Sequence, residues 1–300
     1  MMSSIPLQQP RIELLSLGHK FHTTVAVLRL DLVHPVVSGN KWFKLQGYLS
    51  EAHRQGKKTI VTFGGAFSNH ILATAAAARA AGLHSIGIIR GEEPAVLSPT
   101  LQDALAEGME LHFMERAAYR EKEWPDMIRQ KYPPEDLYLI PEGGYGRTGA
   151  DGAATILQTP GSQDHEHIIA AVGTGTTLAG LALACGNHQT ITGIPVLKNA
   201  HSLHEEINSL LPIERQEKFR LIEGYHFGGY ARHKPELIHF MNELYAADGL
   251  PTDFVYTGKL FYAVHDLMSK GSIAEGSRVL VIHSGGLQGN RSLPKGTLIF

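Results

Sequence analysis

Three times along the chain, a short apolar run ends in a glycine-rich turn. The runs are TIVTF at 59–63, HIIAAV at 167–172 and RVLVIH at 278–283, and glycines follow at 64–65, 173–175 and 285–286. A short buried strand that turns directly into a helix is the repeating unit of a parallel α/β sheet, because parallel neighbours need a helical crossover between them. We therefore predict an α/β protein with open parallel sheets covered by helices on both faces.

The same alternation predicts the remaining elements. Further strands are expected at 84–89, 110–113 and 191–195, and helices at 101–106 and in segments that end near Ala81, Cys185 and Met268. The segment PEGGYGRTGADG at 141–152 is rich in turn formers and is expected to connect elements. We predict two lobes with the active site in the cleft between them: a smaller lobe of residues 48–150, and a larger lobe of residues 1–47 plus 151–300.

Composition favours a small-molecule role. Of the 300 residues 43% are apolar and 19% charged, and the formal net charge is -2, which describes a globular protein without a basic surface for nucleic acid or membrane. The single cysteine, Cys185, excludes an intramolecular disulfide, and no Cys/His spacing typical of a metal site is present. The N-terminus shows no signal peptide and no apolar run is long enough for a membrane span, so we expect a cytoplasmic protein.

Lys41 is a candidate nucleophile. It follows Ser38, Gly39 and Asn40 and is expected in the first turn of a helix. The positive end of the helix dipole disfavours the ammonium form and favours the free amine that attacks carbonyls. Such an amine suits a Schiff-base lysine, whereas the ordinary alternative is a solvated surface residue.

The motif GTGTT, from Gly173 to Thr177, follows a predicted buried strand and opens a helix. Glycines allow close backbone approach, and the N–H groups and the hydroxyls of Thr174, Thr176 and Thr177 can hold a phosphate. It is not a Walker loop, because no lysine follows, and Leu178 replaces the third glycine of the dinucleotide fingerprint. A cofactor that carries one phosphate therefore fits better than ATP or NAD, although a tight turn without a ligand has the same sequence features.

Three further motifs are expected at the carboxyl ends of strands or at helix starts. GGAFSNH at 64–70 offers Ser68 and Asn69, of which one suffices as a helix N-cap and the other is free for a ligand. VYTGK at 255–259 places Tyr256 and Thr257 ahead of a helix, where core packing and capping are their plainest roles. HSGG at 283–286 follows the last strand and would meet the same crevice.

Taken together and in this order, the four motifs around Lys41, Ser68, Gly173 and Tyr256 resemble one family. They are similar to the pyridoxal-phosphate enzymes of the tryptophan synthase β type (fold type II), and specifically to the 1-aminocyclopropane-1-carboxylate (ACC) deaminase and D-cysteine desulfhydrase branch. The resemblance implies the two-lobed fold of that family, pyridoxal 5'-phosphate as the cofactor and a homodimer.

The resemblance also implies roles for individual residues. Lys41 would form the Schiff base with the cofactor, and Ser68 and Tyr256 would act in catalysis. The residues that would hold the cofactor, besides Lys41, are Lys44, Asn69, Gly173, Thr174, Gly175, Thr176, Thr177 and Thr257, with Thr257 at the pyridine nitrogen. The residues that would meet the substrate are Ser68, Asn69, His70, Tyr256 and Ser284.

Two positions favour one branch of the family. The ACC deaminases resembled here carry a glutamate at the position of Thr257 and a leucine at that of Ser284, whereas the desulfhydrases carry small hydroxyl residues. We therefore predict α,β-elimination from a small D-amino acid such as D-cysteine, giving pyruvate, ammonia and sulfide. Two further differences weaken the match: this chain has SGNK where the family has GGNK, and His70 follows Ser68 and Asn69. Both differences bear on the substrate more than on the cofactor.

Other functions stay open at this point. On the same fold, the chain could be an ACC deaminase or an amino-acid racemase. It could also be a pyridoxal-phosphate carrier without turnover, but Ser68 and Tyr256 argue against that. A dinucleotide-binding oxidoreductase is disfavoured, because no acidic residue closes the strand expected after GTGTT.

Overall fold

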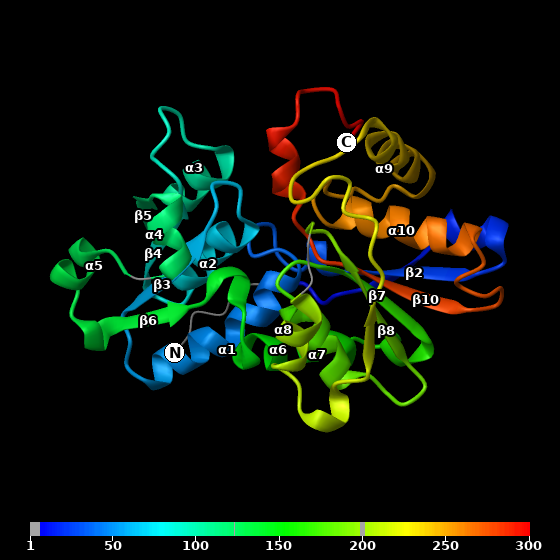
Figure 1. Ribbon diagram of the computed structural model, residues 1–300, viewed down its shortest axis with the longest axis horizontal. Coiled ribbons are helices and arrows are strands. Elements are labelled where there is room, and N and C mark those ends of the chain that lie inside the picture. The colour runs from blue at the N-terminus through cyan, green and yellow to red at the C-terminus, as the bar shows by residue number, and fades with distance from the viewer. Residues whose placement is uncertain (1–6, 123, 199–201) are drawn as a thin grey trace.

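The computed structural model describes residues 7–122, 124–198 and 202–300, and these form two separate β-sheets (Figure 1). The larger sheet has the strand order β1-β2-β10-β7-β8-β9, and all of its pairs are parallel except β1 with β2. Its strands are β1 Ile12–Leu15, β2 Thr24–Arg29, β7 His167–Val172, β8 Thr190–Pro195, β9 Phe219–Leu221 and β10 Arg278–His283. In its centre, Ile282 of β10 lies opposite Leu28 of β2 and Ala170 of β7.

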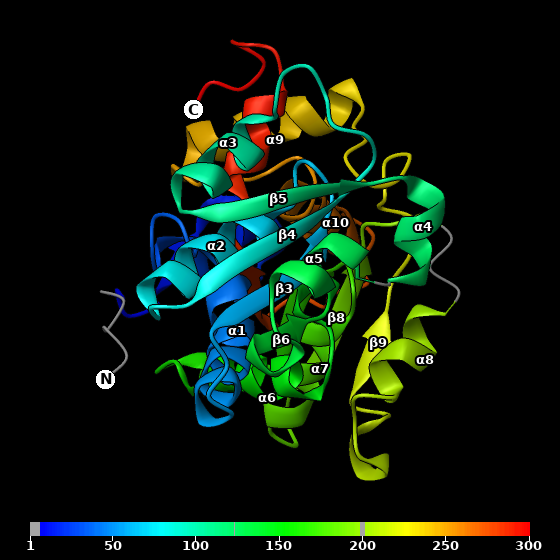
Figure 2. The same ribbon diagram turned by 90° about the vertical axis from the view of Figure 1, so that its left-hand side faces the viewer.

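The smaller sheet is entirely parallel, with the strand order β5-β4-β3-β6, and it faces the viewer in Figure 2. Its strands are β3 Thr59–Gly64, β4 His84–Arg90, β5 Met109–Met114 and β6 Leu137–Ile140. Side chains of β3 alternate between the faces, so that Ile60 packs into one core cluster and Val61 and Phe63 into another. The predicted α/β architecture with parallel sheets is confirmed.

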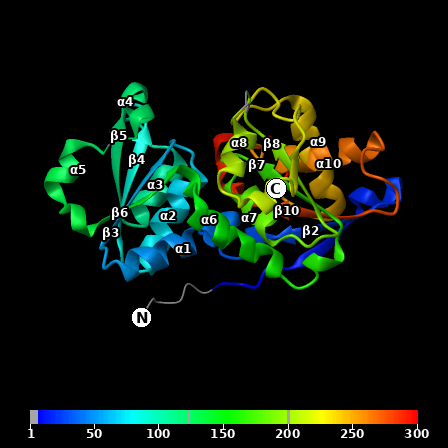
Figure 3. The same cartoon turned by 60° about the horizontal axis from the view of Figure 1, so that its bottom comes forward.

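Helices cover both faces of each sheet (Figure 3). On the larger sheet, α6 (Arg147–Ala154), α7 (Thr176–Ala184) and α8 (Leu203–Asn208) pack on one face, and α9 (Pro235–Asp248) and α10 (Thr257–Ser269) on the other. On the smaller sheet, α2 (Asn69–Ala80) and α3 (Pro99–Ala106) lie opposite α4 (Arg116–Glu121) and α5 (Asp126–Lys131). None of the helices described is long and apolar enough to cross a membrane.

Helix α1 (Asn40–Arg54) belongs to both parts of the molecule. Phe43 packs into the core of the larger sheet, whereas Leu45 and Leu49 pack into that of the smaller one. We propose lobes of residues 48–150 and of 1–47 plus 151–300, because the strands of the two sheets divide between these ranges. Both proposed boundaries fall inside helices, namely α1 and α6, so the chain passes between the sheets within regular structure.

One segment differs from its expected structure. The turn-rich stretch 141–152 contains the helix α6, which packs closely on α1 and α7. A Cβ atom on Gly152 would lie 2.0 Å from the carbonyl oxygen of Phe43, and one on Gly149 would lie 2.3 Å from that of Gly144. These glycines therefore permit close backbone contact and do not end the helix. Four strands, β1, β2, β6 and β9, were not predicted, and three of them (β1, β6 and β9) are only three or four residues long.

Candidate active site

A cavity of about 360 Å³ lies where strands of both sheets end. Gly65 follows β3, Arg90 ends β4, Glu142 follows β6, Gly173 follows β7 and Ser284 follows β10, and all five residues line it. The carboxyl ends of parallel strands are the usual ligand site of open α/β sheets. The cavity therefore places the sequence motifs at one location in the cleft between the two sheets.

Lys41 lies in this cavity, at the second position of α1. Its Nζ is 3.4 Å from Oδ1 of Asn40, whose Nδ2 donates a hydrogen bond of 2.7 Å to Oγ1 of Thr177. Burial lowers the pKa of Lys41 to about 8, although the negative charge of Asp253 acts in the opposite direction. A usable fraction of free amine is therefore present near neutral pH.

The turn that precedes Lys41 fits tightly against the HSGG loop. Gly39 has a φ of +70°, and a Cβ atom there would lie 1.9 Å from the carbonyl oxygen of Ser284. That oxygen also accepts a hydrogen bond of 3.3 Å from the backbone N–H of Asn40. Only glycine fits at position 39, and the contact fixes Lys41 relative to Ser284.

The GTGTT loop forms one wall of the cavity through Gly173, Thr174, Gly175 and Thr177. Gly175, with a φ of +79°, precedes α7, which begins without a side-chain cap, so its first N–H groups lack helical partners. Thr176 is fully buried, and its hydroxyl lies 3.3 Å from that of Thr174 without lining the cavity.

Lys44 also lines the cavity. It is only 2% exposed, and burial together with the charge of Lys41 holds the pKa of Lys44 well below its ordinary value. The next turn of α1 therefore adds a second amine beside Lys41.

The helix α2 presents Ser68, Asn69 and His70 to the cavity. Ser68 occupies the N-cap position, but its side chain makes no capping bond, so neither Ser68 nor Asn69 serves as the expected cap. The amide oxygen of Asn69 is buried and has no hydrogen-bond partner. Both side chains are therefore free to address a ligand.

His70 has a defined tautomer. Its Nε2 is 2.8 Å from Oγ1 of Thr62, which donates its own proton to the carbonyl oxygen of Ile140. Nε2 must therefore carry the proton of the ring, and the buried Nδ1 is left as an unpartnered acceptor. Burial and the charges of Lys41 and Lys44 hold the pKa of His70 well below its usual value, so the ring is neutral.

Tyr256 lines the cavity, whereas Thr257 lies behind its wall. Thr257 is fully buried, and its hydroxyl donates to Oδ1 of Asp253 at 2.7 Å and accepts from the Asp253 N–H at 2.7 Å. The Thr257 hydroxyl is therefore engaged with Asp253 behind the cavity wall, and its position at the pyridine nitrogen stays a prediction. Burial, with neighbouring Tyr230 and Asp253, raises the pKa of Tyr256 well above its ordinary value and keeps the phenol protonated.

Several lining residues escaped the sequence reasoning. Tyr230 comes from the loop between β9 and α9, and its ring centroid lies 6.2 Å from that of Tyr256. The fully buried Lys259 ties this loop down by donating to the carbonyl oxygens of His226 and Gly229, each at 2.8 Å. Nothing in the sequence of this loop marks Tyr230. Among the sequence motifs, Lys259 of VYTGK is the residue that contacts the loop.

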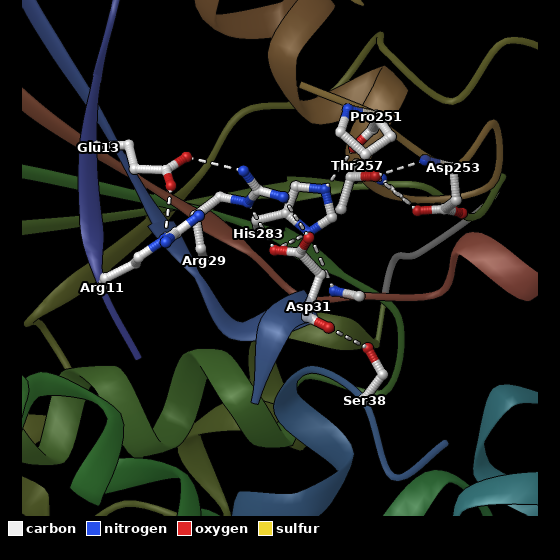
Figure 4. Close-up of polar contacts among 10 residues, drawn as sticks. Arg11, Glu13, Arg29, Asp31, Ser38, Pro251, Asp253, Thr257 and His283 are labelled. Atoms are coloured by element: carbon white, nitrogen blue, oxygen red, sulfur yellow. Dashed lines mark hydrogen bonds and ion pairs between the residues drawn. The ribbon is translucent and has the colours of Figure 1, made fainter. Parts of the chain in front are cut away.

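A largely buried ionic network lies behind Ser38, a residue that lines the cavity (Figure 4). Arg29 donates to both carboxylate oxygens of Asp31, at 2.9 and 2.7 Å, and to Glu13 at 2.7 Å. The backbone oxygen of Asp31 accepts from the Ser38 hydroxyl at 3.1 Å, and its carboxylate faces His283. The network therefore contacts the two loops that meet at Gly39.

Comparisons with known proteins identify the family of this chain. The sequence pattern of the PALP family, pyridoxal-phosphate dependent enzymes, matches residues 3–285. The chain is 33% identical over 309 residues to the "Putative 1-aminocyclopropane-1-carboxylate deaminase" of Pyrococcus abyssi (strain GE5 / Orsay), covering 95% of this chain and 91% of the relative. It is 28% identical over 294 residues to the mitochondrial bifunctional D-cysteine desulfhydrase/1-aminocyclopropane-1-carboxylate deaminase of Arabidopsis thaliana, covering 89% and 73%.

A solved structure described as an ACC deaminase homologue superposes with a TM-score of 0.83 at 27% identity, covering 96% of this chain and 93% of that one. The fold is that of the tryptophan synthase β-like, fold type II enzymes. The chain belongs to the family of pyridoxal-phosphate dependent enzymes.

The residues of the cavity fit pyridoxal phosphate. Gly173, Thr174, Gly175 and Thr177 of GTGTT, with Lys44, would provide donors for its phosphate, and the unpartnered amide oxygen of Asn69 would suit the ring hydroxyl. Lys41 would supply the amine for the aldehyde. When bound, the cofactor supplies an electron sink for charge at the substrate Cα, and the protein chooses which bond breaks.

Proposed function

We propose that this protein catalyses the α,β-elimination of a small D-amino acid, with D-cysteine as the leading candidate, to pyruvate, ammonia and sulfide. The observation that carries the proposal is the position of Lys41, an amine with a pKa of about 8 at the start of α1 and in the same cavity as the GTGTT loop. Family membership supports elimination chemistry, and the choice of substrate is the proposed part.

The chain's own side chains divide the work. Lys41, once released, and Ser68, whose hydroxyl makes no capping bond, are the two groups proposed to take the Cα proton. Tyr256 keeps its phenolic proton, because its pKa is raised, and serves as a donor toward the substrate. The N-terminal end of α2 favours the substrate carboxylate, because its first N–H groups are unpaired within the helix.

Two hydroxyl residues favour D-cysteine over ACC. Neither Thr257 nor Ser284 can supply the carboxylate that would keep a pyridine nitrogen protonated. A neutral ring is a weaker electron sink, which suffices for a thiol leaving group but opens a cyclopropane less readily. ACC deamination is the second candidate, since the relatives from Pyrococcus and Arabidopsis carry that activity in their names.

A direct comparison of substrates tests the proposal. The cofactor-loaded protein is offered D-cysteine, L-cysteine and ACC at equal concentration, and pyruvate, 2-oxobutyrate and sulfide are measured. We expect sulfide and pyruvate in equal amounts from D-cysteine. Faster 2-oxobutyrate release from ACC would select the second candidate, and loss of optical rotation without a keto acid would identify a racemase.

We also propose that the enzyme works as a homodimer in the cytoplasm. The single cysteine, Cys185, is buried and free, which fits a reducing compartment. Large exposed apolar side chains such as Leu14, Val96 and Ile213 are available for a subunit contact. Light scattering of the purified protein tests the dimer, and a single-chain mass would refute it.

A further inference from the structure

Arg90 lines two cavities at once. Besides the active-site cavity, it lines a neighbouring one of about 560 Å³, formed by the residues that follow β4 and β5. Of the two cavities' lining residues, Arg90 alone is common to both. Its side chain is exposed, so its guanidinium is available to a molecule in either space.

The charges around the active-site cavity leave Arg90 without a partner. The charged residues that line it are Lys41, Lys44, Arg90 and Glu142, with a neutral His70. Lys41 is required as a free amine, Lys44 is buried, and Glu142 is paired with Lys122. Within the described residues, the Arg90 side chain makes no ion pair or hydrogen bond, and its guanidinium carbon lies 5.9 Å from the centroid of the Tyr119 ring.

The guanidinium reaches over Gly65 toward the inner cavity. A Cβ atom on Gly65 would lie 3.6 Å from Nη2 of Arg90, so the guanidinium lies beside this cavity-lining residue. In the outer cavity Arg90 is joined by Arg116 but opposed by Glu92 and Glu115. The charges that line the outer cavity therefore balance one another. The positive charge of Arg90 is left uncompensated on the side of the active-site cavity.

We propose that Arg90 selects substrates whose β-substituent carries its own acidic group, such as a carboxylate, sulfate or phosphate. This inference rests on the proposed elimination function and adds a second class of substrate, besides D-cysteine, for the same site. The start of α2 at Ser68 takes the α-carboxylate, which every amino acid has, and Arg90 takes the distal group. A guanidinium can bind such an oxyanion through two parallel hydrogen bonds.

The chemistry makes such a contact useful during the reaction. As the Cα proton passes to the protein base, the bond from Cβ to the leaving group breaks, and its electron pair departs on that group. Water then converts the remaining enamine to keto acid and ammonia. Because the leaving group gains negative charge, Arg90 binds it more strongly as the bond breaks.

The test compares two D-amino acids that differ in the charge of the leaving group. O-Phospho-D-serine carries an acidic one, and β-chloro-D-alanine does not. We expect Arg90→Gln to lower kcat/KM for O-phospho-D-serine about ten- to a hundredfold, the range for a charge-assisted hydrogen bond, and for β-chloro-D-alanine by less than about threefold. Arg90→Lys should restore part of the loss, and Arg116→Gln, in the outer cavity alone, should leave both values unchanged.

Equal losses with the two substrates would overturn the proposal, because Arg90 would then hold the α-carboxylate or act on the fold. No loss with either substrate would overturn it as well. If the wild type eliminates neither compound nor D-cysteine, the proposed function fails; whenever it eliminates neither of the two compounds, Arg90 is tested by absorbance titration of the cofactor-loaded protein with D-aspartate and D-alanine. Arg90→Gln should weaken D-aspartate at least about tenfold more than D-alanine. Equal weakening, or no binding of D-aspartate to the wild type, would overturn the assignment.

Discussion

Nδ1 of His283 lies 3.2 Å from Oδ1 of Asp31, and the backbone N–H of Gly285 approaches the same nitrogen at 3.3 Å. Nε2 of His283 is 2.8 Å from the carbonyl oxygen of Pro251 and must donate to it. The Gly285 N–H donates to Nδ1, and Arg29 donates to both carboxylate oxygens of Asp31. The ionic network thereby holds the HSGG loop against the turn that carries Lys41.

Asp31→Asn should destabilise the protein strongly. It removes the buried carboxylate that pairs with Arg29, whose side chain is 9% exposed, and leaves only the partly exposed Glu13 as a partner; breaking a buried ion pair by removing one partner costs about 3–5 kcal/mol. We expect the free energy of unfolding in denaturant to fall by that amount. Glu13→Gln, at the half-exposed end of the same network, should cost less than about 1 kcal/mol. A similarly small loss for Asp31→Asn would mean that the buried ion pair contributes nothing to the free energy of unfolding.

The reactivity of Lys41 should follow its lowered pKa. An amine attacks the cofactor aldehyde only after it loses its proton, so capture of pyridoxal phosphate by the apo protein should accelerate as pH rises and be half-maximal near about 8, not at the ordinary 10.5. Stopped-flow absorbance across pH 6–10 measures this rate. Asp253→Asn removes a charge that favours the ammonium, so its midpoint should move to lower pH. An upward shift would contradict the assigned electrostatics.

Lys41→Ala should abolish covalent capture of the cofactor. The variant keeps the phosphate loop, so it should still retain pyridoxal phosphate weakly, but without the visible absorbance of the lysine-bound form. Lys295→Ala, on the exposed C-terminal segment, is the control and should absorb like the wild type. A Lys41→Ala protein with an unchanged spectrum would place the reactive amine elsewhere.

Gly39→Ala should cost far more than Gly56→Ala. Both glycines have positive φ, +70° and +67°, so both substitutions carry the left-handed backbone cost of roughly 1–2 kcal/mol. A Cβ atom on Gly56 meets nothing within 4 Å, whereas one on Gly39 collides with Ser284. Denaturant unfolding should show roughly 2 kcal/mol or more between the two variants, with weaker cofactor retention in Gly39→Ala. Equal costs would show that the two loops move apart freely.

The sequence was informative where a local pattern has one physical meaning. Apolar runs followed by glycine located β3, β7 and β10 to within a residue, because runs of five or six residues bounded by turn formers are too short for a typical helix and favour a buried strand. Helix α6 was not predicted, since Gly149 and Gly152 look like turn formers unless the backbone that faces them, at Gly144 and Phe43, is known.

In the active site, too, local sequence patterns revealed only part of the structure. Motif residues were found, but Arg90 and Tyr230 lie at unmarked positions, and only the three-dimensional fold brings them to the cavity. Thr257 was placed by resemblance, and its bonding to Asp253 could not be predicted from its own sequence neighbourhood.

The shared helix α1 has a consequence for how the molecule melts. Cutting the chain at residue 47 or 48 would divide α1, with Phe43 on one fragment and Leu49 on the other. Each fragment would then expose apolar side chains that are buried in the intact protein. The two lobes are therefore expected to unfold in one cooperative transition in calorimetry, and neither lobe should fold stably on its own.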